Sequence, residues 1–219
     1  MSRMSIRALA ARIRTFARRY RGDKRGVAAV EFAFIVPIMF LMFIGAVELS
    51  QAITVDRRVT QVASSAADLV ARKETSISLT EIGDILKIGG YIMSPYSQTP
   101  LKVVMRNVSS SSKSATLTKQ SWQCTYTGIG VDPTPVCTCM NETYALPANL
   151  VSTNDSVVVA EVTYTYSPLI FDYFLQRALA SSSTGQGTYT LTETIYMKPR
   201  GQAAMLLQGN GQPCPTPTF

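Results

Sequence analysis

The sequence predicts an α+β protein, in which a long N-terminal transmembrane helix continues into an extracytoplasmic domain with an antiparallel sheet of about four strands. Three observations support this fold. Residues 27–47 form an almost uninterrupted apolar run, residues 48–73 contain neither Pro nor Gly, and several later segments alternate apolar and polar residues. Such patterns are typical of a membrane span, a helix and β-strands, respectively. The chain has 219 residues, which is enough for one such domain of modest size.

The positive charge of the chain is concentrated at its N-terminus. The formal net charge is +7, but nine of the 21 Lys and Arg residues precede Gly26, where the only acid is Asp23. The rest of the chain is close to neutral, which argues against a nucleic-acid groove, so we expect no nucleic acid partner. By the positive-inside rule, residues 1–26 are a basic cytoplasmic leader, and everything after Glu48 lies outside.

The apolar run from Val27 to Val47 has the length of a single membrane crossing. At about 1.5 Å per residue it spans roughly 30 Å, the thickness of the hydrocarbon layer. Pro37 lies inside this run and predicts a kink or a locally looser helix, because proline removes one backbone donor. We therefore predict a transmembrane helix over residues 27–47.

Glu31 needs an explanation, because an ionised carboxylate is costly in hydrocarbon. In a plain signal anchor it would be tolerated near the cytoplasmic interface, and a signal peptide would instead be cut after Ala52. A cut between Gly26 and Val27 explains more, since it creates an α-amino group four residues before Glu31. The carboxylate would gain a cationic partner, lie in the first turn where the helix dipole favours negative charge, and fix the register of packed helices.

The residues around this cut resemble a known processing motif. Gly26 precedes Val27-Ala28-Ala29-Val30, then Glu31-Phe32 and the apolar run, and this pattern resembles the processing site of type IV prepilins. With its Arg-rich leader and single later domain, the chain looks like the TadE-like and TadG-like minor pseudopilins of the tight-adherence (Tad/Flp) pilus system. The close match covers about residues 18–70. It leaves the choice between a TadE-like and a TadG-like role open.

The resemblance implies a pilin-like fold and a role in assembling or priming an adhesive pilus. In that family a prepilin peptidase makes the cut, so Gly26 and Val27 would flank the scissile bond while Glu31 and Phe32 complete the motif. The implied partners are this peptidase, other minor pseudopilins, pilus assembly proteins and inner membrane lipid. The implied location is the bacterial inner membrane with a periplasmic C-terminal domain, and entry into the filament stays open. The major pilins are shorter and usually carry Tyr at the position of Phe32, which favours a minor component.

The segments after the membrane run predict further helix. Residues 48–73 carry one apolar stripe at spacings of three and four, which predicts an amphipathic extension of the transmembrane helix. We expect this stripe to pack against its own domain or against neighbouring subunits, and both can hold at its two ends. Arg58 falls on the polar side. Ser78 to Glu81 has the form of a capping box, which opens a short helix to about Ile88 that Gly89-Gly90 ends.

The remainder of the predicted domain, residues 74–219, is rich in strands. Four β-rich runs alternate apolar and polar residues, and the first two form a predicted hairpin. The runs cover residues 101–108, 114–123, 155–166 and 187–198. Pro168 to Leu175 is a dense apolar patch, which either folds back on the sheet or docks a pilus partner.

Four cysteines lie in the last hundred residues, at Cys124, Cys137, Cys139 and Cys214. Outside the cytoplasm two disulfides are favoured over a zinc site with four thiolate ligands. We expect Cys124 to join Cys137 or Cys139, and Cys214 to join the other, as structural staples. Which of the two pairings forms stays open at this point.

The sequence offers no catalytic constellation. It has no His, which removes the commonest metal ligand and general base, and we find no phosphate loop, nucleotide fingerprint or paired carboxylates. We therefore expect neither an enzyme nor a cofactor or metal site. The leading hypothesis is a structural minor pseudopilin. The alternative is an uncleaved single-span membrane-anchored receptor or binding domain, and retention of the basic leader would favour it.

Overall fold

The computed structural model describes residues 14–16, 26–128, 135–168, 188–201, 204–209 and 213–219. The chain divides into two units, Met1–Val47 and Glu48–Phe219. Helix α2 (Val27–Ala71) has 45 residues and stays helical through Pro37. Its end at Ala71 lies close to the end of the helix that the sequence predicts, residue 73.

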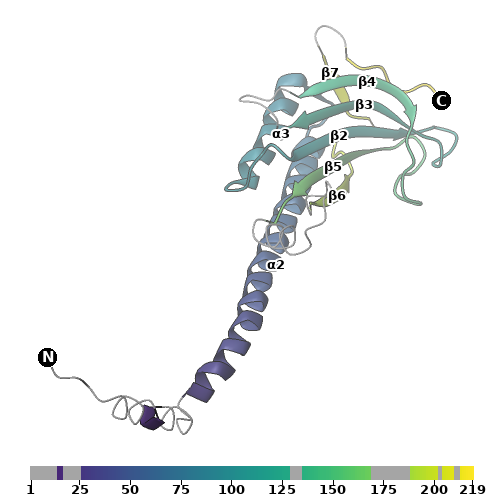
Figure 1. Cartoon of the computed structure of the whole chain (residues 1–219). Coiled ribbons are helices and arrows are strands. Elements are labelled where there is room, and N and C mark those ends of the chain that lie inside the picture. Colours follow the sequence, from purple (N-terminus) through teal and green to yellow (C-terminus); the bar gives the residue numbers. More distant parts are fainter. Residues whose placement is uncertain (1–13, 17–25, 129–134, 169–187, 202–203, 210–212) are drawn as a thin grey trace, which may run out of the picture. The chain divides into compact units, whose positions relative to one another are not determined.

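The second unit contains a five-stranded antiparallel sheet (Figure 1). Its strands follow the order β4-β3-β2-β5-β6, and the short strands β1 and β7 pair in parallel beside it. The α+β prediction is therefore confirmed, with five strands in the main sheet where the sequence predicts about four. The elements after α2 are β1 (Ser76–Ser78), α3 (Leu79–Met93), β2 (Leu101–Ser110), β3 (Thr118–Thr127), β4 (Val136–Thr143), β5 (Ser156–Tyr166), β6 (Tyr189–Met197) and β7 (Leu206–Gln208).

Strand β2 lies at the centre of the sheet, between β3 and β5. It pairs with β3 as the predicted hairpin, and its other side pairs with β5 from Leu101↔Tyr164 to Ser109↔Ser156. A shift of register between Asn107 and Val108 marks a bulge in the β2–β3 pair. The four predicted strands correspond to β2, β3, β5 and β6.

Strand β4 lies in the Cys-rich segment, where the sequence predicts no strand. It pairs with β3 at the edge of the sheet, and all of its side chains are half-buried or exposed. An edge strand of this kind buries no continuous apolar face, so the alternation that identifies the other strands is missing. The disulfides described below hold it in place.

The core of this unit lies between the C-terminal half of α2 and one face of the sheet. The predicted stripe is buried there, with Val55, Val59 and Val62 each at most 1% exposed. They pack in one cluster with strand residues such as Met105 and Val162. Burial of a Val side chain contributes about 1.5–3 kcal/mol, so this part of the stripe stabilises the domain itself.

Helix α3 begins where predicted. Ser78 is its N-cap, Ser78 Oγ accepts a hydrogen bond from Glu81 N at 3.2 Å, and Glu81 Oε2 accepts one from Ser78 N at 3.0 Å. This is the predicted capping box. Each such cap contributes about 1 kcal/mol to helix stability.

The predicted end of this helix at Gly89-Gly90 is wrong, because α3 continues to Met93. Gly89 serves close packing of α3 on α2 in place of a C-cap. A Cβ at Gly89 would lie 2.9 Å from Val62 Cγ1, which is closer than side-chain carbons approach. The chain leaves the helix just before Pro95, which cannot continue it.

Two segments for which the sequence predicts a role lie outside the described residues. They are most of the basic leader and the apolar patch from Leu169 to Leu175.

Candidate functional site

Gly26 and Val27, the predicted cleavage pair, lie at the start of α2. Gly26 immediately precedes the helix, and a Cβ built on it would meet nothing within 4 Å. Val27 is the first residue of α2 and is 53% exposed. The peptide bond between them therefore joins two exposed residues at a helix end, where no packed side chain of the described structure crowds it.

Glu31 is the fifth residue of α2, and the first turn contains no acidic residue. The expectation that Glu31 lies in the first turn is therefore wrong. Because the effect of the helix dipole falls off within that turn, it stabilises this carboxylate little. Glu31 nevertheless stands four positions after Val27, which is the spacing at which side chains on one helix face are neighbours.

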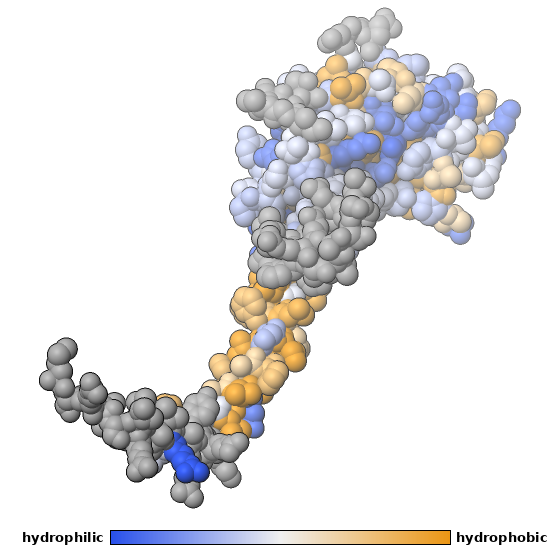
Figure 2. All heavy atoms as spheres, in the orientation of Figure 1, coloured by the Kyte–Doolittle hydropathy of each residue, from blue (hydrophilic) through white to orange (hydrophobic). Residues whose placement is uncertain are grey.

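Phe32 follows on an adjacent face of the helix and is 66% exposed. It belongs to a series of large apolar side chains that are exposed along the first unit (Figure 2). The series comprises Val27, Val30, Phe32, Phe34, Ile35, Val36, Ile38, Met39, Phe40, Leu41, Met42 and Phe43. Figure 2 shows this part of α2 as a surface of apolar residues.

The helix that carries these residues is long and apolar enough to cross a membrane. Water-exposed apolar surface of this extent is rare in soluble monomers and marks a membrane or protein contact. Membrane anchoring through residues 27–47 accounts for it.

The four cysteines form two disulfides. Cys124 on β3 joins Cys137 on β4, and Cys139 on β4 joins Cys214 in the C-terminal tail. The sequence left open which of the two β4 cysteines each bond takes, and strand pairing decides it. Cys124 and Cys137 are direct partners in the β3–β4 register, with Cα atoms 4.0 Å apart.

Arg58 occupies a different place from the one predicted. Its Nη1 donates to the carbonyl oxygen of Ile92 at 2.6 Å and also to that of Ser94, at the C-terminal end of α3. A cation favours that end of a helix, because its last carbonyls lack partners. Arg58 therefore joins α2 to α3, and no local sequence signal identifies this contact, which spans 34 residues.

The described residues contain no group of three or more Cys, Asp and Glu side chains placed to hold a metal ion. The described part of the candidate site therefore consists of an exposed Gly26–Val27 bond at the start of a helix, the Glu31 carboxylate one turn later and a long apolar surface.

A protein-family model described as TadE-like protein matches residues 26–68. This segment is TadE-like. The match begins at Gly26, covers the apolar run of the first unit and continues into the part of α2 that packs in the second unit. It confirms the resemblance that the motif residues indicate. No curated protein and no solved structure matches the chain.

The TadE-like segment ends before the sheet begins. Residues 69–219, which contain α3, both disulfides and every strand of the described residues, lie beyond the match. The relation to the tight-adherence pilus therefore rests on the helix and its N-terminal motif.

Proposed function

We propose that this protein is a minor pseudopilin of a tight-adherence pilus, which a prepilin peptidase processes between Gly26 and Val27. The observation that carries the proposal is the TadE-like match, which starts at this glycine and runs along the exposed apolar helix. In this proposal the protein is a structural component, not an enzyme. Its partners are the peptidase, other minor pseudopilins and pilus assembly proteins.

The arrangement in the membrane follows from the charge distribution. The basic leader, residues 1–26, stays in the cytoplasm, residues 27–47 cross the bacterial inner membrane, and residues 48–73 extend the helix into the periplasm. The domain of residues 74–219 is then periplasmic, where its two disulfides are stable against reduction. Three features thus agree with one topology: the cluster of positive charge, the apolar helix and the oxidised cysteines.

Cleavage would change the chemistry at Glu31. It removes the basic leader and leaves an α-amino group on Val27, four residues before the carboxylate. The cation and the carboxylate can then pair within one helix, or between the helices of neighbouring subunits. Pairing offsets part of the cost of a carboxylate in the membrane, which is about 2.5–3.5 kcal/mol at the centre of a helix for a charged residue such as Asp.

The role of Glu31 is tested by substitution in cells that assemble the pilus. We expect Glu31→Ala and Glu31→Gln to insert and to be cleaved normally, but to lose piliation and co-purification with other minor pseudopilins. Glu31→Asp keeps the charge and serves as the matched control, with partial function expected. The readouts are membrane fractionation, intact mass, and pilus counts by electron microscopy. Wild-type piliation in both neutral variants would count against pairing at Glu31.

A further inference from the structure

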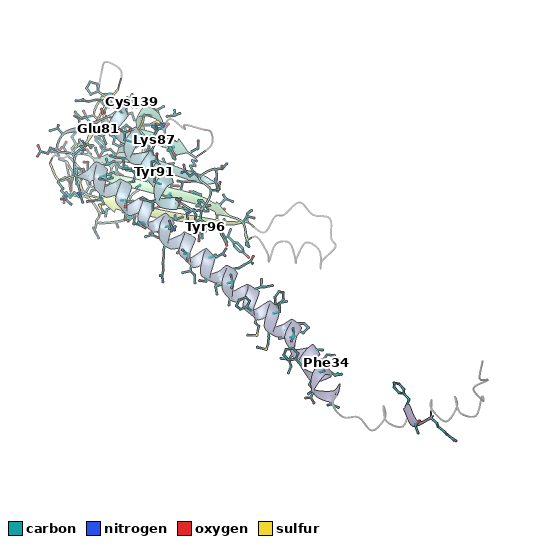
Figure 3. The ribbon with its side chains drawn as sticks, turned by 90° about the vertical axis from the view of Figure 1, so that its left-hand side faces the viewer. Phe34, Glu81, Lys87, Tyr91, Tyr96 and Cys139 are labelled. Atoms are coloured by element: carbon teal, nitrogen blue, oxygen red, sulfur yellow. A yellow bond between two sulfur atoms is a disulfide. The ribbon has the colours of Figure 1, made fainter. Side chains whose placement is uncertain are left out.

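The two disulfides share one strand of the sheet. Cys137 and Cys139 are two residues apart on β4, and side chains at this spacing in a strand lie on the same face. Cys137 bonds to Cys124 on the neighbouring strand β3, and Cys139 bonds to Cys214 in the tail. All four cysteines belong to the second unit, and Figure 3 shows Cys139 at its periphery. Two thiols with different partners therefore lie close together on β4 before the bonds form.

The register of β3 with β4 selects the partner of Cys124. Cys124 and Cys137 are direct partners with Cα atoms 4.0 Å apart, whereas Cys139 stands opposite Trp122, which is fully buried. Register is strongly specified where a strand buries one face, as β3 does. A hairpin forms in about 1–10 μs, whereas disulfide formation takes seconds to hours, so the strands pair before the bond closes. The Cys124–Cys137 bond thus needs only the contacts of one hairpin.

Cys214 meets Cys139 through contacts that span the whole domain. The backbone N–H of Cys214 donates to the carbonyl oxygen of Leu207 at 2.9 Å, and Leu207 belongs to β7. Strand β7 pairs in parallel with β1, where Ile77 is the partner of Leu207, and both side chains are at most 2% exposed. The tail therefore takes its position after β1 and β7 have come together in the folded core. The second bond is a late contact for this reason.

Each disulfide joins cysteines that follow one another in the chain. Cys124 pairs with the next cysteine along, and Cys139 pairs with the one after it, across separations of 13 and 75 residues. A chain is synthesised from its N-terminus at about 5–20 residues per second, so Cys214 follows Cys139 by roughly 4–15 s. Oxidation in the order of appearance therefore gives the native pairs and leaves nothing to reshuffle.

We propose that a thiol oxidase closes the two bonds in chain order, Cys124–Cys137 first and Cys139–Cys214 last, and that the chain needs no disulfide isomerase. For each bond, one cysteine thiolate of the chain attacks the disulfide of the oxidase and forms a mixed disulfide. The second thiolate of the pair then attacks the sulfur of the first, which closes the bond and releases the oxidase as a dithiol. The chain loses two protons and two electrons per bond, and the oxidase gains both electrons.

The inference rests on the extracytoplasmic position of residues 74–219 in the proposed function, because the cytoplasm keeps thiols reduced. It does not rest on cleavage or on pilus assembly. The partner that it adds is an enzyme whose reactive group is an easily reduced disulfide. Catalysis is needed because the first bond has to close in the seconds before Cys214 appears, and uncatalysed formation takes seconds to hours.

The order of closure is measured in cells that express the full chain, by pulse labelling and then alkylation of free thiols with a maleimide that adds mass. The wild type is followed in three strains: an unmodified one, one without the periplasmic thiol oxidase and one without the periplasmic disulfide isomerase. We expect an early species whose two free thiols map to Cys139 and Cys214, and then the fully oxidised chain. Loss of the oxidase should slow both steps by more than about tenfold, toward the uncatalysed rate. Loss of the isomerase should change neither step.

Ile77→Asp separates the two steps in the unmodified strain. A charge at this buried position disturbs the pairing of β1 with β7, so we expect the second bond to be delayed or lost. The first bond should form at the wild-type rate, because it depends on the hairpin alone. Thr75→Asp is the matched control, since it places the same charge at an exposed position two residues away, and both bonds should close normally.

Several results would overturn the proposal. They are an early species with Cys139–Cys214 already closed, a requirement for the isomerase, unchanged oxidation without the oxidase, and equal delay of both bonds in Ile77→Asp. If all four thiols stay reduced in the unmodified strain, the domain is not extracytoplasmic, and the topology of the proposed function fails together with this proposal. Ordered oxidation of a chain that keeps its leader would support this proposal and contradict only the cleavage.

Discussion

Glu81 is held by three contacts to its neighbours. Its Oε1 lies 2.5 Å from Lys73 Nζ, and its Oε2 accepts hydrogen bonds from Ser78 N at 3.0 Å and Ser78 Oγ at 3.1 Å. Lys73 first, and then Ser78, lower the pKa of Glu81 from 4.5 to about 2. The side chain is 45% exposed, so solvent screening keeps the contribution to stability small.

This pKa predicts how stability depends on pH. Because the pKa of Glu81 is lower in the folded state, ionised Glu81 stabilises the domain above pH 4.5, and this contribution is lost as the pH falls toward about 2. We expect the free energy of unfolding of Glu81→Gln to fall less over this range than that of the wild type. Denaturant unfolding of the purified full chain at several pH values measures it. Asp84→Asn, which removes an exposed carboxylate from the same helix, controls for the lost charge. Parallel pH profiles for the wild type and Glu81→Gln would contradict the account.

The sequence predicts contacts between residues that lie close together in the chain. The capping box at Ser78 and Glu81 lies within one turn, so it is visible as a pattern. Lys73 and Arg58 are different, because their partners depend on where α2 ends and how α3 folds back beside it. No sequence pattern predicts which residues of α3 these two side chains will meet.

At the scale of elements, the C-terminal tail depends on one disulfide and a few polar contacts. Cys139–Cys214 closes a separation of 75 residues. Beyond it, Asn141 Nδ2 donates to Thr218 Oγ1 at 3.0 Å, and Lys119 Nζ donates to the Thr218 carbonyl oxygen at 2.6 Å. Both of these hydrogen bonds are exposed to solvent, so we expect the disulfide to dominate.

Replacing both Cys139 and Cys214 with Ser should therefore release the tail. In the chain-entropy model this loss lowers the free energy of unfolding by about 4 kcal/mol, and loss of Cys124–Cys137 lowers it by about 3 kcal/mol. The specific readout is digestion of the tail by carboxypeptidase. We expect it to be faster in the Cys139/Cys214 variant and unchanged in a Cys124/Cys137 double Ser variant, which is the matched control. Equal digestion of the two variants would show that other contacts hold the tail.

Some strands show a clear alternation of apolar and polar residues in the sequence, and one does not. Strands β2, β3, β5 and β6 carry alternating patterns, and three of them bury a continuous face, so the sequence predicts them. Strand β4 is an exposed edge and was missed for that reason. The sequence predicts a helix stop at Gly89, whereas its lack of a side chain serves the contact with Val62. Glycine at a helix end and glycine at a helix contact look alike in a single sequence.

At the scale of the whole molecule, the order of features along the chain predicted the fold class. A basic segment, an apolar run, an amphipathic extension and β-rich runs follow one another. The first two are recognised by their composition, and the last two by the spacing of their apolar residues. The sheet order could not be predicted in the same way. Strand β2 pairs with β5 across a long insertion, and the burial of the α2 stripe against the sheet favours that arrangement. Such pairing is a property of the packed core and not of any one segment.

The molecule as a whole joins a TadE-like helix to a disulfide-stapled α+β unit. We propose that the basic leader is removed at Gly26 and that the mature chain acts from the membrane. The uncleaved receptor, the alternative function, keeps the leader and leaves Glu31 without a cationic partner from Val27. The two accounts therefore differ in the first residue of the mature protein.

The most direct test is the N-terminal residue of the protein isolated from native membranes, determined by intact mass and peptide sequencing. Our account predicts a chain that starts at Val27, with the α-amino group four residues before Glu31. A mature chain that still carries Arg3 to Arg25 would contradict it and would support the uncleaved anchor.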